Sequence, residues 1–304
     1  MKYLCLISFS VVFLLGGCVT MNDSNQLQDD QSEIEEVHDR YVNVTDYTGE
    51  GYDLPDGEAT DPIANEKMTE IEKAVSTFFL EEYKTDVIVH NAVGNADGAT
   101  VFVQSIGEPQ FHTYAMIGID IEKGDIKAEN IWTETNQVEQ AIFSGLLVMI
   151  MEEEFSELDT FISEIAATNP VVGLREEAIN NVKATAYTTP YYFVQPLALR
   201  DEMAQMTNLY FDNPNISADE LRQHFDKESY EAEKLIISIS FFMEEKEPDP
   251  ALFDNIVDSF KDVEGVPRAN YTLSLHDNKI NKQSASGDQN NSLEISDIIK
   301  RRGD

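Results

Sequence analysis

The chain of 304 residues is predicted to be an α+β protein, with an N-terminal helix plus antiparallel β-meander followed by a helix-rich α+β region. Three observations support this prediction. Apolar residues recur at helical spacing between Pro62 and Tyr83, extended apolar runs follow between Val87 and Trp132, and helical spacing returns after Gln137. Helices and strands that are segregated along a chain are typical of the α+β class.

The first predicted unit spans residues 41–133. Its helix begins at Asp61 and Pro62, an N-cap followed by a proline in the first turn, and runs to Tyr83. Turn sequences rich in glycine, asparagine and proline separate the apolar runs that follow, so we expect neighbouring strands to pair in antiparallel fashion. The predicted strands are Val87–Val89, Thr100–Ile106, Phe111–Ile121 and a short segment that ends toward Trp132.

The second predicted unit spans residues 134–276 and is richer in helix. Residues 138–151 are apolar almost all round, which indicates a buried central helix. Ser217 and Glu220 have the spacing of a capping box at the start of another helix. The strand-like segments are Tyr191–Val194, Tyr271–Leu275 and Leu235–Phe241, the last of which is equally compatible with a helix.

Polar segments are predicted on both sides of these units. Residues 277–304 are expected to be a frayed polar tail, because they lack a sustained apolar pattern. Residues 18–40 are polar and acidic and are expected to be a disordered spacer that follows a lipidated cysteine.

The N-terminus has the order of a secretory signal. Lys2 precedes an uncharged run from Tyr3 to Leu15, and Gly16-Gly17-Cys18 follows. Leu15 to Cys18 resembles the lipobox of bacterial lipoproteins, which implies that residues 1–17 are a signal peptide cleaved after Gly17. The resemblance further implies diacylglycerol on the Cys18 thiol and an acyl chain on its amine. The alternative is an uncleaved membrane anchor, since the uncharged run reaches Met21.

Both interpretations place the folded part of the chain on the extracytoplasmic face of the cell membrane. The expected membrane partner is the bilayer that holds the lipid anchor, because two or three acyl chains give a durable tether. The only cysteines are Cys5 and Cys18, so the mature chain is predicted to have no disulfide. No cofactor is expected apart from the covalent lipid.

The charge of the chain excludes one large class of partner. The formal net charge is −36, from 57 acidic and 21 basic residues. Such a field repels phosphate backbones, so no nucleic acid is expected as a partner. The acidic residues are spread along the chain, which favours a role in solubility over the alternative of cationic ligands.

Several stretches together resemble a family of lipoproteins of unknown function from Gram-positive bacteria. The matching segments include Asp46–Tyr52, Glu72–Val75, Tyr83–Asp86, His90-Asn91, Asp97–Val103, Gly107–Pro109, Thr189–Tyr192 and Asp277–Lys282. The resemblance runs from Val44 to Lys282. It implies a lipid-anchored envelope protein and supplies no catalytic or binding residue.

The sequence contains none of the common catalytic motifs for nucleophilic, phosphate-binding or zinc chemistry. His90 and His112 lie on predicted neighbouring strands with Glu108 nearby, and this arrangement would suit an acid/base pair or a zinc site. The favoured alternative is that both histidines have ordinary structural roles in the sheet.

Two further groups of residues are candidates for binding. Asp46, Glu50, Asp53 and Asp56 lie in a glycine-rich loop that runs to Asp61 and could supply oxygen ligands to calcium, although the EF-hand spacing fails and an acidic turn is favoured. Tyr191 and Tyr192, flanked by Tyr187 and Phe193, could form an aromatic platform for a sugar or a peptide. Alternation along a buried strand explains these aromatic residues as well, and is favoured.

These observations predict a non-enzymatic, lipid-tethered module of the cell envelope that binds an unidentified protein or envelope ligand. The alternative function is an envelope hydrolase with an unrecognised acid/base or metal site, for which His90, His112 and Glu108 are the first candidates.

Overall fold

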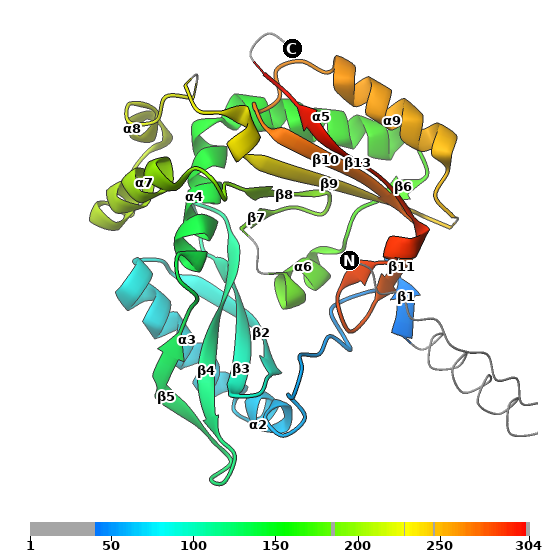
Figure 1. The fold of residues 1–304 in the computed structure, drawn as a ribbon. Coiled ribbons are helices and arrows are strands. Elements are labelled where there is room, and N and C mark those ends of the chain that lie inside the picture. The colour runs from blue at the N-terminus through cyan, green and yellow to red at the C-terminus, as the bar shows by residue number, and fades with distance from the viewer. Residues whose placement is uncertain (1–39, 184–185, 228, 246, 302–304) are drawn as a thin grey trace, which may run out of the picture. The chain divides into compact units, whose positions relative to one another are not determined.

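The computed structural model describes residues 40–183, 186–227, 229–245 and 247–301, and these contain helices and three sheets of the predicted α+β class (Figure 1). Residues 1–39 lie outside the described residues, and with them the predicted signal peptide, Cys18 and all but the last residue of the spacer. In the described part of the chain, no helix is long and apolar enough to cross a membrane.

The first predicted unit forms a four-stranded antiparallel meander in the order β2-β3-β4-β5. The helix predicted over 62–83 is divided at Lys67, whose φ of −96° and ψ of 12° depart from helical geometry. The elements are α2 (Asp61–Glu66), α3 (Met68–Tyr83), β2 (Val87–Gly94), β3 (Gly98–Ser105), β4 (His112–Asp120) and β5 (Asp125–Trp132).

The two faces of the meander have different coverings. Apolar side chains of one face, such as Val101 and Ile117, pack with Ile71 and Val75 of α3 in the main hydrophobic core. The other face carries polar and aromatic residues and contacts helix α6 (Glu176–Val182). This second face therefore faces the C-terminal half of the chain.

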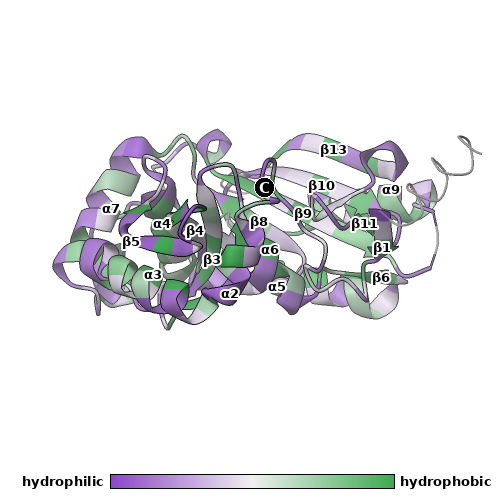
Figure 2. Cartoon of the chain, turned by 90° about the horizontal axis from the view of Figure 1, so that it is seen from below, coloured by the Kyte–Doolittle hydropathy of each residue, from purple (hydrophilic) through white to green (hydrophobic). Residues whose placement is uncertain are grey.

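Helices dominate the next part of the chain. The predicted central helix is α4 (Gln137–Ile150), which is buried along most of its length. It contacts α7 (Arg200–Asp212) and α8 (Ala218–Arg222), and α8 begins with the predicted capping box. Figure 2 shows hydrophilic and hydrophobic positions mixed along α3 and α7, as expected for helices with one face on the core.

The C-terminal half contains a mixed sheet in the order β13-β10-β9-β8-β7, with β6 paired to the end of β9. Strands β9 and β10 are parallel and the other pairs are antiparallel. The strands are β6 (Val171–Val172), β7 (Tyr187–Thr188), β8 (Tyr192–Gln195), β9 (Ile236–Met243), β10 (Asn270–His276) and β13 (Ser292–Ile299). The segment that the sequence left open between helix and strand is therefore strand β9.

Alternation along β9 and β10 gives this sheet an apolar face and a polar face. Ile237, Ile239 and Leu273 lie in the main core, to which α5 (Glu152–Thr168) and α9 (Pro250–Asp262) also contribute. Their neighbours on the opposite face are mainly serine and threonine. Figure 1 shows α5 and α9 on one side of these strands and α6 on the other.

The prediction of a frayed polar tail is wrong for residues 277–301. Strand β13 pairs with β10 along its length, and β11 (Lys279–Asn281) pairs with β1 (Tyr41–Asn43) and β12 (Ser286–Gly287). A short helix, η2 (Gln289–Asn291), precedes β13 as η1 (Ala232–Lys234) precedes β9. The sequence concealed these strands because β13 is an edge strand with several exposed side chains.

The main hydrophobic core draws on both predicted units, and residues 40–304 form one compact unit. A second, smaller core joins the two ends of that unit to α6. Its buried residues are Val44, Tyr47, Ala178, Val182, Phe242, Ile280 and Ala285. This small core positions the hollows described next.

Candidate functional site

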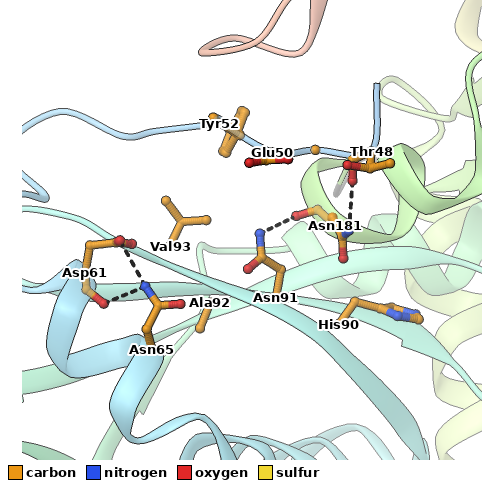
Figure 3. A pocket seen from close by; sticks show the side chains of 12 residues that line it. Thr48, Glu50, Tyr52, Asp61, Asn65, His90, Asn91, Ala92, Val93 and Asn181 are labelled. Carbon is orange, nitrogen blue, oxygen red and sulfur yellow. Dashed lines mark hydrogen bonds between the residues drawn. The ribbon is translucent and has the colours of Figure 1, made fainter. Parts of the chain in front are cut away.

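Residues at the C-terminal end of α6 line two hollows. The Asn181 hollow has a volume of about 530 Å³ and lies between loop 48–52, the start of α2, strand β2 and Asn181 (Figure 3). The Lys183 hollow has a volume of about 470 Å³ and lies on the polar face of β8, β9 and β10, below segment 285–289 and beside Lys183. Both volumes are in the range of small-molecule sites.

Side-chain amides hold the walls of the Asn181 hollow together. Asn181 Nδ2 donates to the carbonyl oxygen of Thr48 at 2.8 Å, and Asn91 Nδ2 donates to the carbonyl oxygen of Asn181 at 3.0 Å. Asp61 accepts hydrogen bonds from the backbone N–H of Gly94 at 2.9 Å and from Asn65 Nδ2 at 3.0 Å. Figure 3 shows two groups of hydrogen bonds, Asp61 with Asn65 on one side of the hollow and Asn91 with Asn181 and Thr48 on the other. In both groups the side chains bond other parts of the protein.

The Lys183 hollow has a floor of hydroxyl groups. Ser238 lies level with Thr272, and Ser240 lies level with Ser274, because β9 and β10 run in parallel without a shift. Ser274 Oγ is 3.0 Å from Ser240 Oγ. Period-two alternation therefore places four hydroxyl side chains on one face over two neighbouring strands.

His276 continues this floor at the end of β10. Its Nε2 is 3.0 Å from Ser274 Oγ, and its ring stacks on Phe242 at 4.9 Å. The backbone of Gly287 passes so close that a Cβ there would lie 2.9 Å from His276 Nδ1. Nδ1 is buried and has no hydrogen-bond partner among the described residues. Burial lowers the pKa of His276, although Asp277 and Glu294 act in the opposite direction.

Lys183 supplies the basic group of this hollow. Its Nζ donates to the carbonyl oxygen of Ala285 at 2.6 Å, and no carboxylate of the described residues pairs with it. Burial lowers the pKa of Lys183 to about 8. An ammonium has three donors, so two of them have no acceptor among the described residues.

The predicted acid/base group is not assembled. His90 and His112 lie on the same face of the meander, but Gln104 of β3 lies between them: it pairs with His112 in register and its Oε1 is 3.0 Å from His90 Nε2. His112 is buried and bonds Asn180 of α6 at 2.9 Å. The Glu108 carboxylate accepts a hydrogen bond of 3.2 Å from the backbone N–H of Gln110, within the same turn. The expectation that His90 and His112 lie on neighbouring strands is wrong, because β3 separates β2 from β4, and the acid/base alternative loses its geometric basis.

The four acidic residues considered as alternative calcium ligands are not brought together. Asp46, Glu50, Asp53 and Asp56 are all exposed, and the described residues contain no group of three or more His, Cys, Asp or Glu residues that could hold a metal ion. The loop wraps around the buried Tyr47, whose hydroxyl donates to the carbonyl oxygen of Lys282 at 2.9 Å. This packing separates the carboxylates, and only Glu50 lines a hollow.

Tyr191 and Tyr192 border the Lys183 hollow but do not form an aromatic platform in it. The Tyr192 ring is 3% exposed and stacks on Phe155 of α5, and its hydroxyl donates to Asp159 at 2.9 Å. Tyr191 packs against Phe241 of the core. The core packing that the sequence analysis favours accounts for both rings, with Tyr192 on the core face of β8 and Tyr191 just before that strand.

Sequence reasoning missed the residues that make the Lys183 hollow. The signal was present as serine and threonine at alternate positions of two β-branched segments, Ser238-Ile-Ser240 and Thr272-Leu-Ser274. Lys183 and His276 carried no local signal, because only the packing of α6 and of segment 285–289 brings them to these strands.

Comparison with known proteins gives the family and the fold. A model of the family described as "Protein of unknown function (DUF1672)" matches residues 34–300. No curated protein matches the sequence. The crystal structure of a DUF1672 family protein from Staphylococcus aureus subsp. aureus Mu50 is similar in fold, with a TM-score of 0.64 and 17% identity. The match covers 86% of this chain and 99% of that one. The chain therefore belongs to the DUF1672 family of proteins of unknown function.

Proposed function

We propose that this protein is a lipid-tethered component of the extracytoplasmic face of the cell membrane, and that it binds a small ligand in the Lys183 hollow. The tether rests on one observation, the run from Tyr3 to Leu15 that ends in Gly16-Gly17-Cys18. A durable anchor requires more than one acyl chain, and a lipidated cysteine provides two or three.

The content of the Lys183 hollow supports ligand binding. It combines apolar walls, such as Leu174 and Phe193, with a small number of convergent polar groups. A hollow of this composition that also holds groups with shifted pKa values is the default location of a ligand site.

One observation favours a second candidate function, hydrolysis, because Ser274 and His276 are within hydrogen-bond distance. Two features oppose it. A catalytic histidine is held by a further group on its other ring nitrogen, whereas Nδ1 of His276 has no partner. Ser274 is 5% exposed and its hydroxyl also bonds Ser240. Binding is therefore the better supported function.

Lipid labelling tests the tether. The intact chain should incorporate a labelled fatty acid and fractionate with membranes, and Cys18→Ala should abolish the label. Retention of the label on the Cys18→Ala chain would contradict the proposal. A Cys5→Ala chain is the matched control, because this cysteine precedes the predicted cleavage site.

Turnover assays test binding against hydrolysis. The purified chain should leave ester, amide and glycoside substrates intact. Turnover that Ser274→Ala abolishes, and that substitution of an exposed serine outside the hollow, Ser156→Ala, leaves in place, would establish the second candidate function instead.

A further inference from the structure

The geometry points to a carboxylate-bearing small molecule as the ligand of the Lys183 hollow, with its carboxylate at the Lys183 amine and its hydroxyl or amide groups on the row Ser238, Ser240, Thr272 and Ser274. This inference rests on the proposed binding function and specifies the chemical class of the ligand.

The first argument is the lack of a counter-ion at Lys183. The chain has 57 acidic residues against 21 basic ones, and exposed cations such as Lys123 and Lys261 pair with carboxylates. Lys300, which is 4% exposed, donates to two carbonyl oxygens. The Lys183 amine donates a hydrogen bond to a single carbonyl oxygen among the described residues, that of Ala285. A partly buried ammonium without a counter-ion is costly, and an anionic ligand removes that cost.

The second argument is the hydroxyl row. Four serine and threonine side chains on two parallel strands offer both donors and acceptors, as sugar hydroxyls and peptide amides require. Aromatic rings of Phe193 and Phe242 lie beside the row and provide apolar contact. The volume of about 470 Å³ suits one sugar residue or a short peptide end.

The third argument separates a carboxylate from a phosphate. The lining of the hollow includes one amine and no arginine, whereas phosphate sites use arginine forks or helix N-termini. Glu294 lies opposite Ser274 on β13 and also lines the hollow. A dianion would be repelled more strongly by this carboxylate than a monoanion would be.

Matched pairs of probes test the inference on the full-length chain in detergent. The first pair is N-acetylmuramic acid and N-acetylglucosamine, which differ by a lactyl carboxylate. The second is acetyl-alanyl-alanine and its C-terminal amide. In calorimetric titration, we expect the acid of one pair to bind at least about tenfold more tightly than its neutral partner. The pair that shows this difference tells whether the ligand is a sugar acid or the end of a peptide.

Variants test the role of the lysine. Lys183→Met should reduce the affinity for the acid by at least about tenfold and abolish the preference over the neutral partner. Lys73→Met removes an equal charge from the exposed face of α3 and should leave the affinity unchanged. The bound acid should also protect Lys183 of the unaltered chain from acetylation, which avoids any effect of substitution on folding.

Three outcomes would overturn the inference: equal affinity for the acid and the neutral partner, an unchanged affinity of Lys183→Met for the acid, or no binding of either pair with no protection of Lys183. Binding of a neutral partner at the hydroxyl row would still support the proposed binding function. The tether is tested separately by lipid labelling, so its failure is distinguishable from failure of carboxylate recognition.

Discussion

The two hollows that meet the end of α6 differ in their linings and in where their hydrogen bonds go: asparagines, acidic residues and glycines line the first, and hydroxyl and aromatic side chains with Lys183 line the second. In the Asn181 hollow, the amides of Asn91 and Asn181 bond main-chain carbonyls, and Asp61 bonds the backbone of Gly94. In the Lys183 hollow, the amine of Lys183 donates to one carbonyl oxygen, and Nδ1 of His276 has no hydrogen-bond partner among the described residues. Satisfied polar groups stabilise the fold, whereas an unsatisfied group that borders the hollow, such as the Lys183 amine, can still bind a ligand.

This difference gives the two hollows separate roles. The Asn181 hollow holds loop 48–52 against α6 and β2, although it has the larger volume. The Lys183 hollow is smaller, and its polar groups are directed at space that a ligand can occupy. Volume therefore distinguishes the two hollows less well than the number of polar groups in their walls that still have free hydrogen-bonding capacity.

The largest expected effect is a gain in stability on replacing Lys183. Lys183→Met should raise the free energy of unfolding by about 2 kcal/mol at pH 7 in urea titration: a pKa lowered from 10.5 to about 8 corresponds to about 3 kcal/mol, and the lost bond to Ala285 offsets about 1 kcal/mol. A substitution that stabilises the protein while weakening ligand binding is the expected signature of a functional residue.

The pH dependence of the same variant provides its control. The folded pKa of Lys183 lies below the unfolded value, so between pH 8 and 10.5 the unfolded chain binds more protons and the stability of the unaltered protein rises with pH. Lys183→Met should lack this rise. A variant less stable than the original at pH 7 would contradict the description of the Lys183 hollow.

A smaller effect of opposite sign is expected in the Asn181 hollow. Asn181→Ala removes the bond to the Thr48 carbonyl and should lower the free energy of unfolding by about 1 to 2 kcal/mol. Asn65→Ala, which removes bonds from an exposed amide, should change it by less than about 0.5 kcal/mol. Equal effects of the two substitutions in chemical unfolding would mean that the Asn181 network does not hold the loop.

Acid should destabilise the protein partly through His276. Burial lowers the pKa of His276 in the folded state, so its stabilising contribution is present above the ordinary pKa of 6.5 and is lost as the pH falls through the folded pKa. His276→Gln should make the unfolding free energy depend less steeply on pH below 6.5. His112 has the same direction of shift for the same reason, and His112→Gln provides a comparison outside the Lys183 hollow.

A ligand distinguishes these two histidines. The bound carboxylate probe should alter the acid dependence that involves His276 and leave that of His112 unchanged, because only His276 lines the Lys183 hollow. The same change at both residues would indicate a general effect on folding.

The smallest expected effect is that of calcium on the acidic loop. Asp46, Glu50, Asp53 and Asp56 are exposed and do not form a cluster that could hold a metal ion. About 5 mM calcium, above the dissociation constants of about 1 mM that mark weak extracellular sites, should leave the Tm unchanged. A rise in Tm that Glu50→Gln abolishes would restore a cation-binding role for the Asn181 hollow.

Local patterns predicted much of the fold. The α+β class, the buried helix α4, the capping box at Ser217 and the antiparallel meander all follow from periodicity, caps and turn sequences. These features depend on residues a few positions apart, so they can be read from one chain. The division of the first helix at Lys67 and the strands after residue 277 were missed, because tertiary packing overrides weak local preferences.

The sequence by itself determined the class of the fold, and it carries two predictions that rest on it alone: a lipid tether at Cys18 and, from the charge, no nucleic-acid partner. Only the tertiary structure decided which polar residues share a site. Lys183 reaches the carbonyl of Ala285 across 102 positions of sequence, and Ser274 of β10 meets Ser240 of β9 across 34 positions. No local pattern encodes such contacts, because they arise from the packing of α6 and segment 285–289 against the sheet.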